Sequence, residues 1–249
     1  YVTSNSFSES TFTGGGFSTF VTQGNPALRA EFSQQFETGI EAKFFKGRMG
    51  IDLTYYANKT VDQLLNPRLS YASGAILKWI NGGDVVNRGL ELQLTATPVK
   101  TKKFTWDVTV NWARNRNEIL RMPSDLPFFY NADTWIGGIR NIATKGGSVF
   151  DLAATRFLRN TAGDVLISPT SGLPVRISDY IKVADRQPDW NMGFVNSFTF
   201  LNDWNVSFNL DIRKGGDIFN GTEWFLYSRG ASVRTLDRET PRVIHGVLQ

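Results

Sequence analysis

The clearest structural signal in the chain is the stretch Arg88-Gly89-Leu90-Glu91-Leu92-Gln93-Leu94-Thr95-Ala96-Thr97. Leucine or alanine alternates in it with glycine, glutamate, glutamine or threonine. Because successive side chains of an extended chain point to opposite sides, this period of two predicts a strand with one apolar and one polar face. A tilted strand of about ten residues can cross the hydrocarbon layer of a bilayer. The stretch therefore predicts a membrane-spanning strand.

Five other stretches show a similar alternation and complete three hairpins. The expected strands cover residues 36–45 and 49–58, 88–97 and 104–113, and 191–201 and 204–213. Within each pair the connection is short and rich in residues that tolerate turns: Lys46-Gly47-Arg48, Lys100-Thr101-Lys102 and Asn202-Asp203. Between pairs the connections are long, covering residues 59–87 and 117–188. Structureless connections of such length are rare in compact soluble domains.

Short turns at one end and long loops at the other characterise transmembrane β-barrels. We therefore expect an all-β fold of antiparallel up-and-down strands that form part of a large transmembrane β-barrel, with long extracellular loops and short periplasmic turns. In this interpretation residues 1–249 are a partial barrel domain. Its segments are a preceding loop (1–30), three hairpins (31–58, 86–116 and 191–216), a long extracellular loop (117–190) and a truncated loop (217–249). Even the smallest barrels need about eight strands, so we expect the chain to be a piece of something larger.

The composition agrees with a barrel. Only 41% of residues are hydrophobic, as expected when half of each strand faces a water-filled lumen. No run of about 20 apolar residues is present, which excludes an α-helical membrane protein. Aromatic residues make up 13% of the chain, and several fall at expected strand ends, where interfacial girdles lie: Phe44, Phe45, Tyr55, Tyr56, Phe104, Trp112, Phe200 and Trp204. The core of a soluble sandwich could also use such residues.

The charged residues and the absence of cysteine narrow the chemistry. The net charge is +4, but the 27 basic residues are scattered or lie in turns, a pattern that argues against a nucleic-acid-binding stripe. With no cysteine, disulfides, thiolate metal sites and thiol nucleophiles are excluded. His245 is the only histidine, and no serine in a nucleophile-like turn lies near it. We therefore expect no enzyme activity and no cofactor or metal site.

Two acidic pairs could supply carboxylates for glycoside hydrolysis or calcium binding. They are Asp185 with Asp189 and Asp62 with Asp84. Such chemistry needs two carboxyl groups at a controlled separation, which the sequence does not specify here. We interpret all four as solvated loop acids.

The aromatic residues of the long connections are the candidate substrate-binding residues: Tyr71, Trp79, Phe128, Tyr130 and Trp135. Sugar rings stack on such side chains while neighbouring polar residues satisfy the hydroxyl groups. Packing of the loops against each other or against a lid protein is the alternative interpretation. The lumen-facing residues of the strands are the other place where function could reside.

Gly39 and Gly89 fall on the polar side of their expected strands. A missing side chain there lets the barrel wall bend, or lets a neighbouring plug or backbone approach closely. We expect local strand curvature at both positions.

Ordered motifs along the chain resemble one known family. They are Asn25-Pro26-Ala27-Leu28-Arg29-Ala30-Glu31, Phe36-Glu37-Thr38-Gly39-Ile40-Glu41, Asp52-Leu53-Thr54-Tyr55-Tyr56, Asn81-Gly82-Gly83-Asp84-Val85-Val86-Asn87-Arg88-Gly89-Leu90-Glu91, Pro188-Asp189-Trp190-Asn191-Met192-Gly193, Asp211-Ile212-Arg213-Lys214-Gly215-Gly216-Asp217-Ile218-Phe219-Asn220 and Arg238-Glu239-Thr240-Pro241-Arg242-Val243. In this order they resemble the later barrel of SusC/RagA-type TonB-dependent transporters.

The resemblance implies an outer-membrane location and a 22-stranded barrel with an N-terminal plug domain. It also implies import of a large nutrient, commonly a glycan or a peptide, with energy from the TonB–ExbB–ExbD complex and a lipoprotein lid of the SusD type. The plug, the TonB box and the final strands have no counterpart in these residues, and His245 stands where the family often carries proline. Two alternatives stay open: a passive porin and a soluble carbohydrate-binding β-sandwich.

Overall fold

The computed structural model describes residues 7–10, 16–19, 22–132, 138–177, 179–201, 203–241 and 243–248. Most of them lie in strands. The strands are β1 (Phe7–Ser10), β2 (Gly16–Thr19), β3 (Thr22–Gln23), β4 (Phe32–Phe44), β5 (Met49–Leu65), β6 (Leu77–Lys78), β7 (Ile80–Lys100), β8 (Phe104–Arg121), β9 (Phe128–Ala132), β10 (Ile139–Thr144), β11 (Asp151–Ala154), β12 (Leu166–Ile167), β13 (Ile181–Asp185), β14 (Pro188–Phe200), β15 (Trp204–Gly215) and β16 (Val247–Leu248). The helices are α1 (Gly221–Ser228) and the short 3-10 helices η2 (Tyr71–Ser73) and η3 (Val233–Thr235). Among the described residues, no helix is both long and apolar enough to span a membrane.

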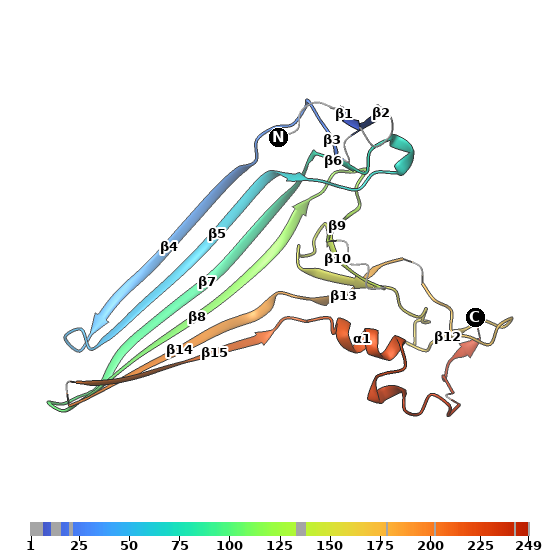
Figure 1. Ribbon diagram of the computed structural model, residues 1–249. Coiled ribbons are helices and arrows are strands. Elements are labelled where there is room, and N and C mark those ends of the chain that lie inside the picture. Colours follow the sequence, from blue (N-terminus) through green and yellow to red (C-terminus); the bar gives the residue numbers. More distant parts are fainter. Residues whose placement is uncertain are drawn as a thin grey trace. The chain divides into compact units, whose positions relative to one another are not determined.

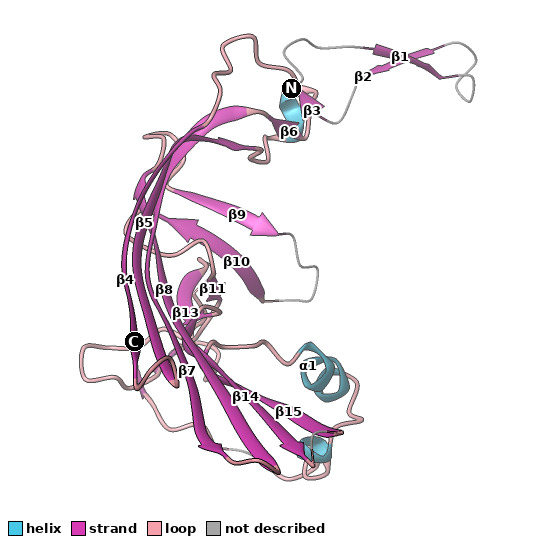
Figure 2. Ribbon diagram, turned by 90° about the vertical axis from the view of Figure 1, so that its left-hand side faces the viewer, coloured by secondary structure: helices cyan, strands magenta, loops and turns pink. Residues whose placement is uncertain are grey.

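A six-stranded sheet in the order β15-β14-β8-β7-β5-β4 dominates the first of two compact units, which comprises residues 1–130, 143–149 and 187–216. Every neighbouring pair in this sheet is antiparallel, and the hairpins β4–β5, β7–β8 and β14–β15 follow each other along it (Figure 1). Figure 2 shows the long strands bending together into an arc. The prediction of an antiparallel barrel-type fold is confirmed.

The turns within the hairpins are as short as predicted. After β4, Phe45, Lys46 and Gly47 all have positive φ, and the Gly47 N–H donates to the Phe44 carbonyl at 3.1 Å. After β7, the Thr101 hydroxyl oxygen accepts a hydrogen bond from the Phe104 N–H at 2.9 Å. In the third turn the Asp203 N–H donates to the Phe200 carbonyl at 3.2 Å. Asn202 lies outside the described residues.

The strands continue further at the opposite end than the alternating pattern indicates. β5 reaches Leu65 and β7 begins at Ile80, so most of the expected loop 59–87 is strand. Alternation fails there because residues 143–149 of the same unit cover the sheet, and the Ile119 N–H donates to the Gly147 carbonyl at 2.9 Å. Val85, Ile119 and Ala143 form a small buried core beneath this segment. Val85 and Val86 are both buried, and Val85 belongs to this core.

The expected long loop 117–190 contains strands rather than structureless chain. β13, β11, β10 and β9 form a four-stranded sheet in that order. Most of it belongs to the second unit, which comprises residues 131–142, 150–186 and 217–249. In that unit the Asp151 carboxylate is fully buried and pairs with the Lys182 ammonium at 2.7 Å. The expected loop 217–249 carries α1, where the Asn220 side chain caps the Glu223 N–H at 2.9 Å.

Aromatic rings gather at the short-turn end of the sheet. Phe104 lies 5.2 Å from Phe200 and 6.2 Å from Phe198 between ring centroids, and Trp106 stacks on Phe198 at 5.9 Å. Such a cluster at the end of membrane strands is typical of an interfacial girdle. Tyr56 does not belong to it, because its hydroxyl bonds a polar side chain on the other face of the sheet.

Candidate functional site

The two faces of the six-stranded sheet differ in chemistry along one continuous register. Leu53, Leu92, Trp112, Met192 and Ile212 lie side by side across five strands. This row belongs to the apolar wall: Ile40, Leu53, Leu92, Leu94, Val110, Trp112, Met192, Phe194, Leu210 and Ile212. Side chains on the apolar wall stay open to the surroundings, Ile40 by 70% and Leu210 by 57%, which suits contact with lipid.

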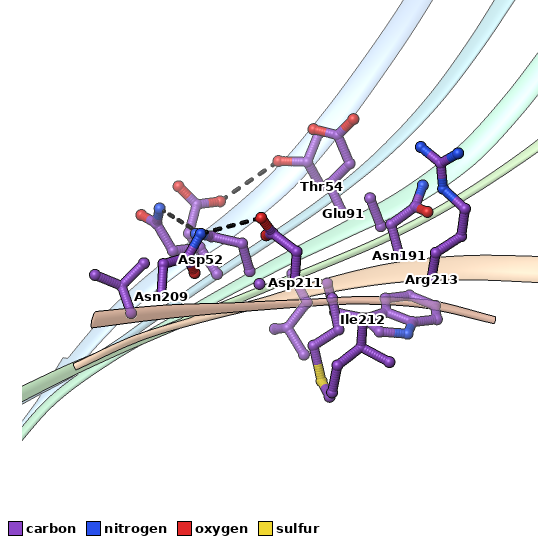
Figure 3. A pocket seen from close by; sticks show the side chains of 16 residues that line it. Asp52, Thr54, Glu91, Asn191, Asn209, Asp211, Ile212 and Arg213 are labelled. Carbon is purple, nitrogen blue, oxygen red and sulfur yellow. Dashed lines mark hydrogen bonds between the residues drawn. The ribbon is translucent and has the colours of Figure 1, made fainter. Parts of the chain in front are cut away.

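The next row of the same register lies on the opposite face and is polar. It runs from Thr54 through Glu91 and Ala113 to Asn191 and Arg213. We call the face that carries it the polar wall: Asp52, Thr54, Tyr56, Glu91, Gln93, Asn111, Asn115, Asn191, Asn209, Asp211 and Arg213. In Figure 3 the labelled carboxylates, amides and guanidinium rise from one side of the strands, whereas Ile212 lies on the other.

Most residues of the polar wall border an open hollow of about 870 Å³, which Leu92, Trp112, Met192 and Ile212 also border. Neighbouring side chains in it are held by hydrogen bonds: the Gln93 amide donates to the Asn111 amide oxygen at 2.9 Å, and the Asn209 amide donates to Asp211 at 3.2 Å. Three carboxylates, of Asp52, Glu91 and Asp211, and one guanidinium, of Arg213, are among the groups that line it. The hollow therefore offers hydrogen-bond acceptors and donors under a net negative charge.

Tyr56 organises the polar wall by reaching across a whole strand. Its side chain starts on β5, passes over Gly89 on β7, and donates a hydrogen bond to Asn115 on β8 at 3.1 Å. A Cβ at Gly89 would lie 2.4 Å from the Tyr56 ring. The sequence leads us to expect local curvature at Gly89, and the structure shows that the Tyr56 side chain also lies close to this residue. Asn115 in turn donates to Asn87 at 3.4 Å.

A network of ion pairs lies at the loop end of β5, β7 and β8, beyond the apolar wall. The Arg121 guanidinium lies 2.8 Å from the carboxylates of both Asp62 and Asp84, and Arg29 lies 3.0 Å from Asp62. The hydrogen bond from Arg121 holds the pKa of Asp84 below its ordinary value. The interpretation of this pair as solvated loop acids is therefore wrong. Both carboxylates are neutralised by arginine, an arrangement suited to structure rather than to glycoside hydrolysis.

The two residues of the second acidic pair each contact another residue. The Asp189 carboxylate pairs with Arg116 at 2.7 Å. The Asp185 backbone N–H donates to the Asp217 carboxylate at 3.0 Å. Across the part of the chain that the structure describes, no three histidine or acidic side chains are grouped so that they could hold a metal ion.

The five predicted substrate-binding residues are only partly brought together. Phe128 and Tyr130 pack on one face of β9, with ring centroids 5.1 Å apart and planes inclined by 52°. Trp79 accepts a hydrogen bond from the Asn25 amide on its carbonyl oxygen at 2.9 Å, and Tyr71 begins η2. Trp135 lies outside the described residues. Binding by these residues stays a prediction.

The sequence analysis does not name the residues of the polar wall individually, although the alternating pattern marks them. The alternation that identifies each strand also marks its polar side, so Glu91, Gln93 and Asp211 could be assigned to the lumen strand by strand. Which of them become neighbours depends on the register between strands. That register is a property of the folded sheet.

A curved antiparallel sheet with one lipid-compatible face and one polar, hollowed face defines a section of an outer-membrane β-barrel. The family described as "TonB dependent receptor-like, beta-barrel" matches residues 2–233, and the chain belongs to that family. The resemblance to SusC/RagA-type transporters and the outer-membrane location are thereby confirmed.

Several known proteins share this section. TonB-dependent receptor P3 of Formosa agariphila is 27% identical over 234 residues, which are 86% of this chain and 23% of that protein. TonB-dependent receptor SusC of Bacteroides thetaiotaomicron is 29% identical over 124 residues, 49% of this chain and 12% of that protein. The chain spans less than a quarter of the length of these relatives.

One solved structure shares the fold at lower identity. The RagAB peptide importer in its closed-closed state superposes with a TM-score of 0.65 at 21% identity, over 88% of this chain and 25% of that one. This likeness shows that the six-stranded sheet has the architecture of a barrel section.

Proposed function

We propose that the chain is one section of a TonB-dependent transporter that actively imports a large nutrient across the outer membrane. The observation that carries the proposal is the polar wall, a hollowed, hydrogen-bonding surface on the side of the sheet opposite the apolar wall. A wall of this kind suits the lumen of a transport barrel. The family supplies the second support, because the relatives at this level of identity are TonB-dependent receptors.

The proposed substrate is an oligosaccharide or a peptide. Amide, hydroxyl and carboxylate groups on the polar wall match the many donors of either class. SusC and the RagAB peptide importer are the relatives that motivate this choice. The protein would act as the transporter subunit of a SusCD-like complex, with a SusD-like surface lipoprotein as lid and TonB–ExbB–ExbD as the energy source.

Phe128 and Tyr130 form the proposed aromatic contact for the substrate. Phe128 is 42% exposed, and its ring makes an inclined pair with Tyr130. Phe129, between them, packs against the buried core of Val85, Ile119 and Ala143 and so anchors the strand. An anchored strand that presents two rings on its other face offers a fixed stacking surface.

Uptake measurements test the transport proposal. Cells that carry or lack the whole protein would receive a fluorescently labelled oligosaccharide mixture or a labelled peptide digest, each with and without a functional TonB. We expect uptake of one of the two classes to require both the protein and TonB. TonB-independent uptake would instead show a passive porin, and unchanged uptake in cells that lack the protein would overturn the proposal.

Binding measurements test the aromatic contact separately. With the substrate class known, Phe128→Ala together with Tyr130→Ala should weaken binding by about tenfold, because each ring stacking contributes about 0.5–1.5 kcal/mol. Phe128→Leu is the matched control, since it retains an apolar side chain but not a flat ring. Unchanged affinity in the double variant would remove these residues from the site and leave transport itself untouched.

A further inference from the structure

The lipid-facing side of the sheet changes from apolar to basic at the loop end of β8 and β15. Arg114 comes two residues after Trp112 on β8, and Lys214 comes two residues after Ile212 on β15. Residues two apart on a strand share a face, so both cations continue the apolar wall. β14 runs between these strands in the sheet (Figure 1).

The register places an aromatic residue between the two cations. Trp190 on β14 lies opposite Lys214, and the next residue, Asn191, lies opposite Ala113, which precedes Arg114. We call Arg114, Trp190 and Lys214 the basic row. Tryptophan with arginine and lysine is the combination that membrane proteins place at the boundary between hydrocarbon and headgroups.

Two other cations of this region, Arg88 and Arg116, are already balanced. Arg88 and Arg116 lie directly opposite each other, which would be unfavourable for two like charges. Arg88 pairs with Glu118 at 3.4 Å, however, and Arg116 pairs with Asp189 at 2.7 Å. These four residues leave no net charge for a ligand.

Arg114 and Lys214 differ from them. Both residues are exposed, and within the described ranges neither side chain makes an ion pair or a hydrogen bond. Two uncompensated positive charges therefore stand on the lipid-facing side of the sheet, next to an indole ring.

The depth of the basic row matches the boundary of a lipid layer. Phe104 begins β8 within the aromatic cluster at the short-turn end. From Phe104 to Arg114 the strand rises roughly 33 Å, or about 25 Å along the membrane normal for a tilt near 40°, which is about the height of the apolar band of such barrels. The basic row thus lies where the phosphate groups of lipids are found.

We propose that the basic row binds the phosphate group of a membrane lipid headgroup. The Arg114 guanidinium suits a forked contact to two phosphate oxygens, and the Lys214 ammonium adds a point charge from the neighbouring hairpin. The acyl chains of the same lipid lie along the apolar wall below. Continuity of the two surfaces distinguishes this site from one for a soluble anion.

Native mass spectrometry of the whole protein in mild detergent tests the proposal. The probes are short-chain phosphatidic acid and the diacylglycerol with the same acyl chains. We expect phosphatidic acid to remain bound and diacylglycerol to dissociate. Arg114→Gln with Lys214→Gln should reduce binding of phosphatidic acid roughly thirtyfold, since each basic residue near an anionic lipid surface contributes about 1 kcal/mol.

Two controls keep the result interpretable. Lys46→Gln with Lys102→Gln removes two cations from the short turns and should leave binding unchanged, and Arg114→Lys with Lys214→Arg should retain it. Equal retention of both lipids by the unaltered protein would overturn the proposal without any variant. Full displacement of the lipid by an equal concentration of inorganic phosphate would also overturn it, because the acyl chains would then add nothing.

Discussion

The apolar wall and the polar wall are built from the same strands, yet they respond to different constraints. Leu92 and Leu94 on one face and Glu91 and Gln93 on the other alternate along a single stretch of β7. The apolar wall carries few hydrogen bonds and depends on the hydrocarbon around it. The polar wall is organised by contacts among its own side chains, such as the bond from Tyr56 to Asn115.

One strand can therefore tolerate many side chains on one face and few on the other. Any apolar side chain of suitable size satisfies lipid, because contact with hydrocarbon is not directional. A hydrogen-bonded wall needs particular neighbours at particular spacings. Substitutions at adjacent positions of one strand should therefore differ widely in effect, and they give the means to test the comparison.

A charge at the centre of the apolar wall should have the largest effect. We expect Leu94→Arg to destabilise the whole protein in lipid vesicles by about 2–4 kcal/mol. At the bilayer midplane the guanidinium loses its hydration and gains no partner in exchange. The measurement is unfolding by denaturant in vesicles.

The neighbouring residue provides a matched control on the polar wall. Thr95 is exposed on the lumen side of the same strand, so Thr95→Arg should cost less than about 1 kcal/mol. Equal costs for the two arginines would contradict the assignment of the two faces.

Filling the space above Gly89 should have the next largest effect. In Gly89→Ala the new Cβ would meet the Tyr56 ring at 2.4 Å, so the ring must move and lose its bond to Asn115. We expect a loss of about 1–3 kcal/mol in the free energy of unfolding, the usual range for overpacking.

Two further variants sharpen this prediction. Gly193→Ala lies on the same wall, where the nearest atom would be 3.5 Å away, and it should be nearly neutral. Combining Gly89→Ala with Tyr56→Ala should cost less than the sum of the single variants, since the clash is then absent. Strict additivity would show that Tyr56 does not lie over Gly89.

Alternation made the strands and their two faces predictable. In residues 88–97 a period of two is enough to assign the strand, its apolar wall and its lumen side, and the short turns then select the hairpin partners. Alternation fails at Val85 and Val86, which are both buried, and residues of the segment 143–149 pack against Val85. No local pattern reveals a cover that comes from almost 60 residues further along the chain.

The charge network could not be predicted from a single sequence, for a related reason. Asp62 and Asp84 are brought together with Arg121 where the pairing of β5 with β7 and of β7 with β8 becomes irregular. A shift in register changes which side chains meet, and it leaves no mark in the hydrophobic pattern. Gly89 is a similar case. A side chain does not fit at this position, because the Tyr56 ring from another strand lies close to it.

The network at the loop end should respond moderately to loss of its arginine. Arg121→Gln leaves the Asp84 carboxylate without its cation, whereas Asp62 keeps Arg29. We expect a loss of about 1 kcal/mol, because the guanidinium is half exposed and solvent weakens such contacts. Lys43→Gln is the control, since its contact with Glu41 at 3.0 Å is largely exposed, and it should change little. Equal effects of the two substitutions would contradict a special role for Arg121.

The smallest expected effect is the pH dependence of the same network. The bond from Arg121 lowers the pKa of Asp84 in the folded protein, so the ionised form is favoured by folding. This stabilisation is complete above the ordinary carboxyl pKa of about 3.9 and is lost as the pH falls through the lowered pKa of the folded state.

Comparison of Asp84→Asn with the unaltered protein isolates this contribution. The difference in unfolding free energy should be constant from neutral pH to about pH 5 and should shrink at lower pH, because the unaltered protein then loses the same charge. Asp125→Asn removes an exposed carboxylate that has no ion pair in the described part of the chain, and it shows the background effect of one charge. If the two variants had the same pH profile, the loop-end network would be no more than a set of surface charges, and the difference between the two walls would be the only organised feature of the sheet.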